Sequence, residues 1–288
     1  MRSVQTTNKS YCKTKNLKLF MPSYQYLEEQ EPKLQNLMHA ELLDLDRRLA
    51  ELTPADRTTY LKKIAADVAS GRPYAYCVGS APFREFDLIV NESVLIPRPE
   101  TEMMPDIVRE IWKQRNPKSL PTRILDIGTG SGCLAISLAA MYPNAYVEAW
   151  DVSPDALEVA IQNAAKNKAK VTFKTVDVLA EIPDNLKPFD IIVSNPPYVA
   201  KSEVGEDLSD SVFRHEPHLA LFAEDEGLAF YQKFVEVFPV LLSANGVALL
   251  EHGHMQAEGV RGFFGEAFQV ESLDDLQGRP RFLLVFKV

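Results

Sequence analysis

The chain has 288 residues, 46% of them hydrophobic, and a formal net charge of −9 at pH 7. This size and composition are typical of a soluble globular protein with one large domain or two smaller ones. The acidic balance disfavours stable nucleic acid binding, because neutralising a phosphate backbone requires a surplus of Lys and Arg.

Cysteine usage and hydropathy indicate a reducing, aqueous compartment. Cys12, Cys77 and Cys133 are widely spaced and form neither a CxxC pair nor an even disulfide set. No apolar run reaches the length needed to span a bilayer, since the stretch after Cys133 soon meets Tyr142 and Pro143. We therefore expect a cytoplasmic protein that does not enter a membrane.

Residues 1–22 are predicted to be a basic, disordered tail outside the fold. The first 27 residues contain no Asp or Glu but carry five basic residues: Arg2, Lys9, Lys13, Lys15 and Lys18. Such a segment also resembles an organelle transit peptide, which makes an organelle the minor alternative to the cytoplasm. We favour the tail because chain termini are commonly poorly ordered.

Residues 23–82 are predicted to form a small helical domain. Apolar residues recur there at helical spacings of three and four: Leu34, Leu37, Met38, Leu42 and Leu45. Thr53, followed by Pro54 and Asp56, is typical of a helix start, with the hydroxyl as the cap and proline at the first helical position. Gly71 and Pro73 then interrupt the helical pattern.

The segment 83–98 is predicted to be a β-hairpin linker between two domains. Its residues alternate between apolar and polar on both sides of Asn91 and Glu92, where we expect the turn.

After Thr122 the pattern changes to strands that alternate with helices, and we assign residues 99–288 to an α/β domain. Strands are expected at 123–128, 145–151, 171–177, 189–195, 247–252 and 281–288, and helices at 133–142, 154–167, 228–242 and after Met255. Regular alternation predicts a mostly parallel sheet with helices on both faces. Ligands are then expected at the carboxyl ends of the strands.

A glycine loop follows the first of these strands. The sequence DIGTGSG places Asp126 immediately before Gly128, Gly130 and Gly132. Glycines allow a tight turn and close approach to a ligand, and the next helix points its N-terminus at the same place. The spacing GxGxG, not GxGxxG, together with a carboxylate that would repel a pyrophosphate, favours a cationic ligand over a dinucleotide.

Two further acidic residues end the next two strands. Asp151 lies where a carboxylate can accept both hydroxyls of a ribose, and Asp177 is suited to an adenine amino group. Either residue alone could be a helix cap, but three acidic strand ends beside a glycine turn favour a nucleoside-containing ligand.

The strand at 189–195 ends in SNPPY, with Asn195, Pro196, Pro197 and Tyr198. Two successive prolines cannot extend a sheet, since neither donates a backbone N–H, and they hold the local backbone extended. The strand tip therefore offers an Asn side chain, a proline carbonyl and an aromatic face, which suit binding of a planar amide or amidine.

These motifs together resemble a known family. DIGTGSG, Asp151, Asp177 and SNPPYV resemble a class I S-adenosylmethionine-dependent methyltransferase that modifies a planar nitrogen. VLIPRPETE at residues 94–102 narrows the resemblance to the HemK/PrmC family of protein glutamine N5-methyltransferases. The similarity runs from about residue 71 to the C-terminus and includes GRPYAYCVG, HEPHLAL and DDLQGRPR.

The resemblance implies an α/β enzyme with a Rossmann-like, seven-stranded methyltransferase domain at 99–288, preceded by a helical substrate-recognition domain at 23–82. It implies methyl transfer from S-adenosyl-L-methionine to the N5 side-chain amide of the glutamine in the GGQ motif of a class I peptide chain release factor. The product of the cofactor would be S-adenosyl-L-homocysteine, and we expect a monomer.

By the same resemblance, Asn195, Pro196 and Tyr198 are the expected catalytic residues, and Pro197 joins them in substrate binding. The Asn195 oxygen and the Pro196 carbonyl would accept the two N–H groups of the amide, while Tyr198 stacks on its plane. The residues expected around the cofactor are Gly128, Thr129, Gly130, Ser131, Gly132, Asp151, Asp177, Val178 and Asn195.

Other interpretations stay open at this point. The methyl acceptor could be a glutamine in a ribosomal protein, or the exocyclic amine of a base flipped onto Tyr198. A binding module without activity is disfavoured by the complete NPPY sequence, and a nicotinamide enzyme by the lack of GxGxxG. Glu251, His252 and His254 alternate along a strand and could hold a metal, but we favour strand-end histidines and expect no metal site.

Overall fold

The structure is a computed structural model that describes residues 37–200 and 209–287. The chain divides into two compact units, Met1–Cys77 and Val78–Val288, and each is described by itself. The tail predicted at 1–22 and the beginning of the predicted helical domain, 23–36, lie outside the described residues. Among the residues that are described, no helix combines the length and apolar character needed to cross a bilayer.

The described part of the first unit consists of helices and short turns. Its helices are α2 (His39–Ala50), α3 (Pro54–Ala69) and α4 (Tyr74–Val78), the last of which reaches the boundary between the units. Helix α3 begins as predicted, because the Thr53 hydroxyl accepts a hydrogen bond from the Asp56 backbone N–H at 3.3 Å. The Tyr74 hydroxyl donates to Asp44 Oδ2 at 2.9 Å, which ties α4 to α2.

The second unit begins with an antiparallel hairpin of β1 (Ser80–Phe83) and β2 (Phe86–Ile89). The turn predicted at Asn91 and Glu92 is wrong, since the chain reverses at Arg84 and Glu85. Arg84 has φ 53°, a left-handed conformation that the sequence does not mark with Gly or Asn. Asn91 instead makes a later turn, in which its Oδ1 accepts from the Ser93 N–H at 3.0 Å. The linker boundaries at 83 and 98 stay a prediction.

The rest of the second unit is built on a seven-stranded sheet with the order β5-β4-β3-β6-β7-β9-β8. Its strands are β3 (Arg123–Ile127), β4 (Tyr146–Asp151), β5 (Val171–Thr175), β6 (Phe189–Ser194), β7 (Leu242–Glu251), β8 (Phe268–Asp274) and β9 (Pro280–Lys287). Strands β3 to β7 are parallel, β9 is antiparallel to β7, and β8 is antiparallel to β9. The predicted α/β fold is confirmed, although the sequence pattern did not locate β8, a largely exposed edge strand.

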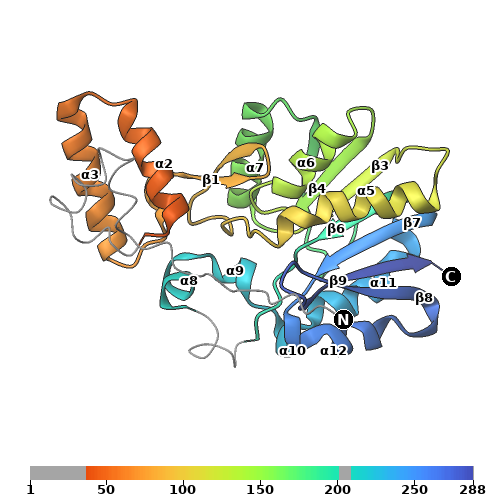
Figure 1. Ribbon diagram of the computed structural model, residues 1–288. Coiled ribbons are helices and arrows are strands. Elements are labelled where there is room, and N and C mark those ends of the chain that lie inside the picture. The colour runs from red at the N-terminus through yellow and green to blue at the C-terminus, as the bar shows by residue number, and fades with distance from the viewer. Residues whose placement is uncertain (1–36, 201–208, 288) are drawn as a thin grey trace, which may run out of the picture. The chain divides into compact units, whose positions relative to one another are not determined.

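Helices cover both faces of this sheet (Figure 1). The helices described in this unit are η3 (Thr101–Met103), α5 (Met104–Arg115), α6 (Cys133–Met141), α7 (Pro154–Lys166), α8 (Asp210–His215), α9 (His218–Leu221), α10 (Glu224–Gly227), α11 (Ala229–Leu241), η5 (His254–Gln256), α12 (Ala257–Phe264) and η6 (Gly265–Ala267). Neighbouring residues of β3 belong to different cores: Ile124 clusters with Val108 of α5, and Leu125 clusters with Phe234 of α11. This alternation explains why the central strands are apolar on both faces.

The strand order reverses at β3, and this reversal places the functional site. From β3 the chain adds β4 and then β5 on one side, and afterwards returns to add β6 on the other side. In open α/β sheets ligands bind in the crevice outside the carboxyl ends of the strands at such a reversal. The loops that follow β3 and β6 therefore frame the candidate site.

Candidate active site

The loop after β3 wraps around the carboxylate of Asp151 at the end of β4. Gly128 and Gly130 have φ values of 71° and 53°, which residues with a side chain rarely adopt. The Gly130 N–H donates to Asp151 Oδ2 at 2.9 Å, and the Ser153 N–H donates to Oδ1 at 2.9 Å. Burial raises the pKa of Asp151, and these backbone N–H groups oppose that rise. The carboxylate of Asp151 is thereby fixed beside the glycine loop.

Asp126 is buried at the end of β3. Its Oδ2 accepts from the Thr129 hydroxyl at 2.6 Å and from the Ala135 backbone N–H at 3.1 Å. Its Oδ1 is buried and has no hydrogen-bond partner among the described residues. Burial, with the nearby Asp151 charge as a smaller cause, raises the pKa of Asp126 to about 7. A cationic group placed at Oδ1 would stabilise the ionised carboxylate.

Asp177 and Val178 lie beyond the end of β5, which stops at Thr175. Asp177 is exposed, and its Oδ1 accepts from the Leu179 N–H at 3.0 Å, whereas Val178 is buried. Both residues line the larger cavity described below. Asp177 is thus a loop residue and not the strand-end residue that the pattern predicted.

The NPPY segment leaves β6 at a point where that strand is tied to β3. The Ser194 hydroxyl donates to the Ile127 carbonyl at 2.7 Å, next to the start of the glycine loop. Farther along, the Tyr198 carbonyl accepts from Gln256 Nε2 at 2.8 Å. A Cβ at Gly227 would lie 2.2 Å from that same carbonyl oxygen, so the close approach requires glycine at 227. The backbone of Tyr198 is therefore held from two sides.

Asn195 is linked to two residues that are not among the predicted site residues. Its Nδ2 donates to Thr101 Oγ1 at 3.0 Å, and Thr101 Oγ1 donates to Glu251 Oε2 at 2.7 Å. Thr101 and Glu251 are both buried. Burial, opposed by the Thr101 hydrogen bond, raises the pKa of Glu251 to about 7. Thr101 belongs to the segment VLIPRPETE, and Glu251 ends β7 directly before His252.

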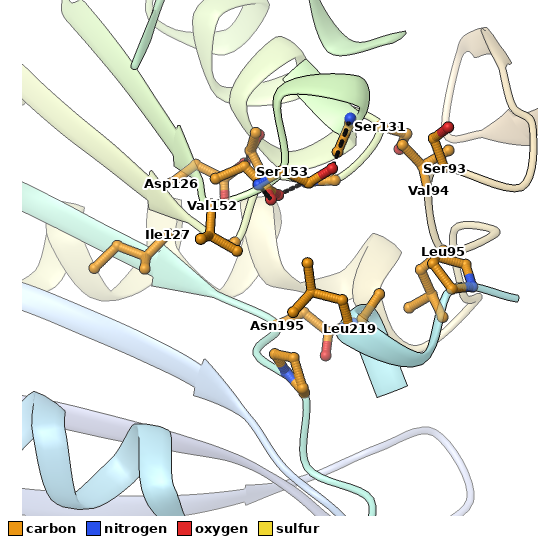
Figure 2. A pocket seen from close by; sticks show the side chains of 18 of the residues that line it. Ser93, Val94, Leu95, Asp126, Ile127, Ser131, Val152, Ser153, Asn195 and Leu219 are labelled. Atoms are coloured by element: carbon orange, nitrogen blue, oxygen red, sulfur yellow. Dashed lines mark hydrogen bonds between the residues drawn. The ribbon is translucent and has the colours of Figure 1, made fainter. Parts of the chain in front are cut away.

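A cavity of about 540 Å³ opens at the carboxyl ends of β3, β4 and β6. Figure 2 shows Asp126, Ile127, Val152 and Ser153 on one side of it, and Ser93, Val94 and Leu95 on the opposite side. The predicted residues that line it are Gly128, Thr129, Gly130, Ser131, Asp151, Asp177, Val178, Asn195 and Pro197. Its volume falls in the range of small-molecule sites.

A second cavity of about 410 Å³ includes Pro196 and Tyr198. Asn195 lines both cavities, as do Leu95 and Arg98 from the segment after the hairpin. The structure thus brings the predicted catalytic side chain to the place where two cavities meet.

Gly132 is the predicted cofactor residue that lines neither cavity. It has φ 82° at the start of α6, and a Cβ there would lie 3.2 Å from the Cβ of Ala160. Its requirement for glycine therefore comes from the turn and from close packing of α6 on α7.

Glu216 fastens the segment after the hairpin to the region of α8 and α9. Its carboxylate accepts from Arg98 Nη2 at 2.7 Å and from the Ile96 backbone N–H at 3.2 Å. Glu216 and Arg98 are 118 residues apart in sequence, so no local pattern could have revealed their pairing.

No group of three or more His, Cys, Asp or Glu side chains within residues 37–200 and 209–287 is arranged to hold a metal ion. His252 is buried at the end of β7, where its Nδ1 lies 2.8 Å from the Gly253 carbonyl.

Comparisons with known proteins match most of the chain. A family model described as "Methyltransferase small domain" matches residues 106–224. The release factor glutamine methyltransferase of Lactococcus lactis subsp. lactis (strain IL1403) is 42% identical over 253 residues, which cover 87% of this chain and 86% of that protein. The protein of the same name from Flavobacterium psychrophilum is 47% identical over 182 residues, 62% of each chain.

A solved structure is also similar to this chain. It is the release factor-specific protein-(glutamine-N5) methyltransferase from Alicyclobacillus acidocaldarius subsp. acidocaldarius, which is 28% identical. The alignment has a TM-score of 0.39 and covers 67% of this chain and 95% of that chain.

Proposed function

This chain belongs to the release factor glutamine methyltransferase family, and from that premise we propose that it methylates the GGQ glutamine of a class I peptide chain release factor. The methyl group would come from S-adenosyl-L-methionine and reach the N5 side-chain amide, leaving S-adenosyl-L-homocysteine. The observation that carries the proposal is the position of Asn195, which lines both cavities and so lies where cofactor and substrate side chain would meet.

The residues around the larger cavity suit S-adenosyl-L-methionine. Oδ1 of Asp126, for which the described residues provide no hydrogen-bond partner, is a buried acceptor for a cationic group. Asp151 would accept from the ribose hydroxyls, Val178 would contact the adenine ring, and Asp177 would accept from the adenine amino group. When bound, the cofactor supplies an electrophilic methyl group on a sulfonium.

The NPPY segment supplies acceptors for a primary amide. Asn195 Nδ2 donates one hydrogen to Thr101, and Oδ1 is the acceptor that this side chain offers to the substrate. This oxygen and the Pro196 carbonyl would accept the two N–H groups of the glutamine, which leaves one face of its nitrogen open to the methyl group. Tyr198 would stack on the amide plane, and because burial raises its pKa, the phenol stays neutral.

Orientation and dehydration are the contributions that this site would make to the rate. An amide nitrogen is a weak nucleophile, because its lone pair is delocalised into the carbonyl. Binding both N–H groups fixes the nitrogen, and a closed cavity removes competing water. Methyl transfer makes the nitrogen positive and its N–H acidic, so the proton can leave to Asn195 Oδ1, to the Pro196 carbonyl or to water. No strong base is required.

We further propose how the protein meets its substrate. The partner is an intact release factor, residues 23–82 take part in recognising it, and the enzyme works as a cytoplasmic monomer without stable nucleic acid binding. The names of the sequence relatives support the release factor as substrate. The net charge of −9 disfavours stable binding to nucleic acid.

The test uses the full chain, S-adenosyl-L-methionine with a labelled methyl group and an intact class I release factor. Tandem mass spectrometry should locate one added methyl group on the GGQ glutamine, and none on a factor whose GGQ glutamine is replaced by alanine. Ribosomal proteins and oligonucleotides are incubated in parallel. A labelled ribosomal glutamine or base, with no label on the release factor, would overturn the proposal.

A further inference from the structure

Two consecutive hydrogen bonds lead from the junction of the two cavities into the interior, and they link Asn195, Thr101 and Glu251. Asn195 Nδ2 lies 3.0 Å from Thr101 Oγ1, which lies 2.7 Å from Glu251 Oε2. Thr101 is 2% exposed and Glu251 is 1% exposed. The three residues come from the end of β6, the start of η3 and the end of β7. Their hydrogen bonds can therefore form only in the folded domain.

The direction of the two hydrogen bonds that link Asn195, Thr101 and Glu251 is fixed while Glu251 is ionised. A carboxylate has no proton to donate, so Thr101 must give its single hydroxyl hydrogen to Glu251. Toward Asn195 the threonine oxygen can then only accept, and only the NH₂ side of an amide can face it. The oxygen of Asn195 is consequently turned away from Thr101 and left for the cavities.

We propose that Thr101 and Glu251 are positioning residues for the methyl transfer, which hold the Asn195 amide with its oxygen toward the substrate glutamine. This inference rests on the proposed function, because the N–H groups of that glutamine are the donors to be accepted. An Asn195 amide turned by 180° would present NH₂ to NH₂, and two donors cannot pair. Productive binding therefore requires the observed orientation.

Protonation of Glu251 would allow the two hydrogen bonds to reverse their direction. A protonated carboxyl can donate to Thr101, whose own hydrogen is then free to bond the oxygen of a turned Asn195 amide. Burial raises the pKa of Glu251 to about 7, so both forms are populated near neutral pH. The charged or titratable groups around it are Arg98 and Glu100 before η3, Cys133 of α6, Tyr198 after β6, Tyr231 of α11 and Arg281 of β9. We expect kcat to rise with pH through about 7.

Substitutions of Thr101 test the hydroxyl. With saturating cofactor, Thr101→Val should lower kcat about tenfold, the effect of losing one orienting hydrogen bond, while Thr101→Ser should restore it to within about twofold. The matched control is Thr122→Val, because Thr122 Oγ1 also donates to a carboxylate, Asp190 Oδ2 at 2.8 Å, but at the amino end of β3. That variant should keep the wild-type kcat.

Substitution of Glu251 tests the pH dependence. The wild-type kcat should be about tenfold higher at pH 8 than at pH 6, the ratio that one group titrating near 7 gives, and Glu251→Gln should remove this rise. Saturating cofactor keeps the titration of Asp126 out of the rate. Glu148→Gln is the matched control, since Glu148 is equally buried but, within the described part of the chain, its side chain bonds to residues of β4 and β5 alone. This variant should keep the wild-type profile.

The side-chain amide resonance of Asn195 provides a readout that needs no substrate. It is identified in the ¹⁵N spectrum by its loss in Asn195→Ala. Its chemical shift should titrate with a midpoint near 7 in the wild type and in Glu148→Gln, but not in Thr101→Val or Glu251→Gln.

Two sets of results separate this inference from the proposed function. Wild-type kcat in Thr101→Val, or an unchanged pH profile in Glu251→Gln with an Asn195 resonance that does not titrate, would overturn the inference. If the Asn195 resonance titrates as expected but the wild type transfers no methyl group to the release factor, the proposed function is wrong. The inference that Thr101 and Glu251 orient the Asn195 amide is then retained.

Discussion

Glu148 and Glu251 are both 1% exposed, yet the structure surrounds them differently. Glu148, in β4, accepts from Trp150 Nε1 at 2.7 Å and from the Tyr146 hydroxyl at 2.8 Å, and it pairs with Lys174 Nζ at 2.7 Å. Burial raises its pKa, but Lys174 and these hydrogen bonds outweigh burial and hold the pKa below its usual range. Glu251 has the Thr101 hydroxyl as its side-chain partner and a raised pKa.

The difference separates a carboxylate that stabilises the sheet from carboxyl groups that the fold tolerates. A cation and several donors offset the desolvation cost of a buried charge, whereas a buried carboxyl without them costs free energy at neutral pH. Glu251 and Asp126 both belong to the second kind, and both lie at the carboxyl ends of central strands. Asp126 lines the larger cavity, and Glu251 is bonded to Thr101, which also lines it. Unfavourable burial of this kind is a mark of functional sites.

The largest expected effect is on the pH dependence of stability without cofactor. Between about pH 4.5 and 7 the folded state binds a proton at Glu251 that the unfolded state has lost, so the free energy of unfolding falls as pH rises through this window. Glu251→Gln should remove about 2.5 kcal/mol of that fall. Chemical denaturation at pH 5 and pH 7.5 measures it. An equal decrease in unfolding free energy between the two pH values in wild type and variant would contradict the raised pKa of Glu251.

Glu148→Gln should show the opposite behaviour. Removing the charge leaves Lys174 without its ion-pair partner and should lower the free energy of unfolding by about 2 kcal/mol at pH 7. Neither Glu148 nor the residues that it bonds to line a cavity, so kcat should stay at the wild-type value. Denaturant titration and the transfer assay measure the two quantities. A loss of kcat with unchanged stability would contradict the assignment of Glu148 to stability and not to catalysis.

Asp126→Asn should affect cofactor affinity more than folding. The wild-type affinity for S-adenosyl-L-methionine should rise with pH from 6 to 8 as Asp126 ionises, because the ionised form binds a cation. The asparagine variant should bind about tenfold more weakly at pH 8, with the pH dependence abolished. Isothermal titration calorimetry at several pH values measures this. Wild-type affinity in the variant would exclude a charge–charge role for Asp126.

The smallest effect is expected at the amino ends of the strands. Asp190 accepts from the Thr122 N–H and hydroxyl through Oδ2 and from the Ser243 hydroxyl through Oδ1. Thr122→Val removes one exposed hydrogen bond and should cost about 0.5–1 kcal/mol of unfolding free energy. Thermal unfolding detects this change. A shift as large as that of Glu148→Gln would show that exposure does not weaken the Asp190 contacts.

Local sequence patterns were sufficient to predict that several candidate residues lie close together. Asp126, Asp151 and Asn195 each end an apolar strand, and parallel strands bring such ends together, so their proximity follows from the fold class. The glycine loop was visible for the same reason. Gly132 was assigned to the cofactor because sequence cannot distinguish a glycine that faces a ligand from one that packs against Ala160.

The contacts that orient Asn195 were not accessible to the same reasoning. Thr101 and Glu251 are 150 residues apart, and Thr101 and Asn195 are 94 apart, so their hydrogen bonds depend on tertiary placement. The hairpin turn at Arg84 was missed because no Gly or Asn marks its left-handed conformation.

The most direct measurement is the single-turnover rate of methyl transfer to an intact class I release factor, for the wild type and Asn195→Ala, with cofactor saturating in both. Saturation removes any difference in cofactor affinity from the rate. If Asn195 Oδ1 orients the glutamine amide, the variant should be at least about a hundredfold slower, since misplacement of a reacting group costs that much. Equal rates would contradict the assignment of the NPPY tip as the place where the methyl group is transferred.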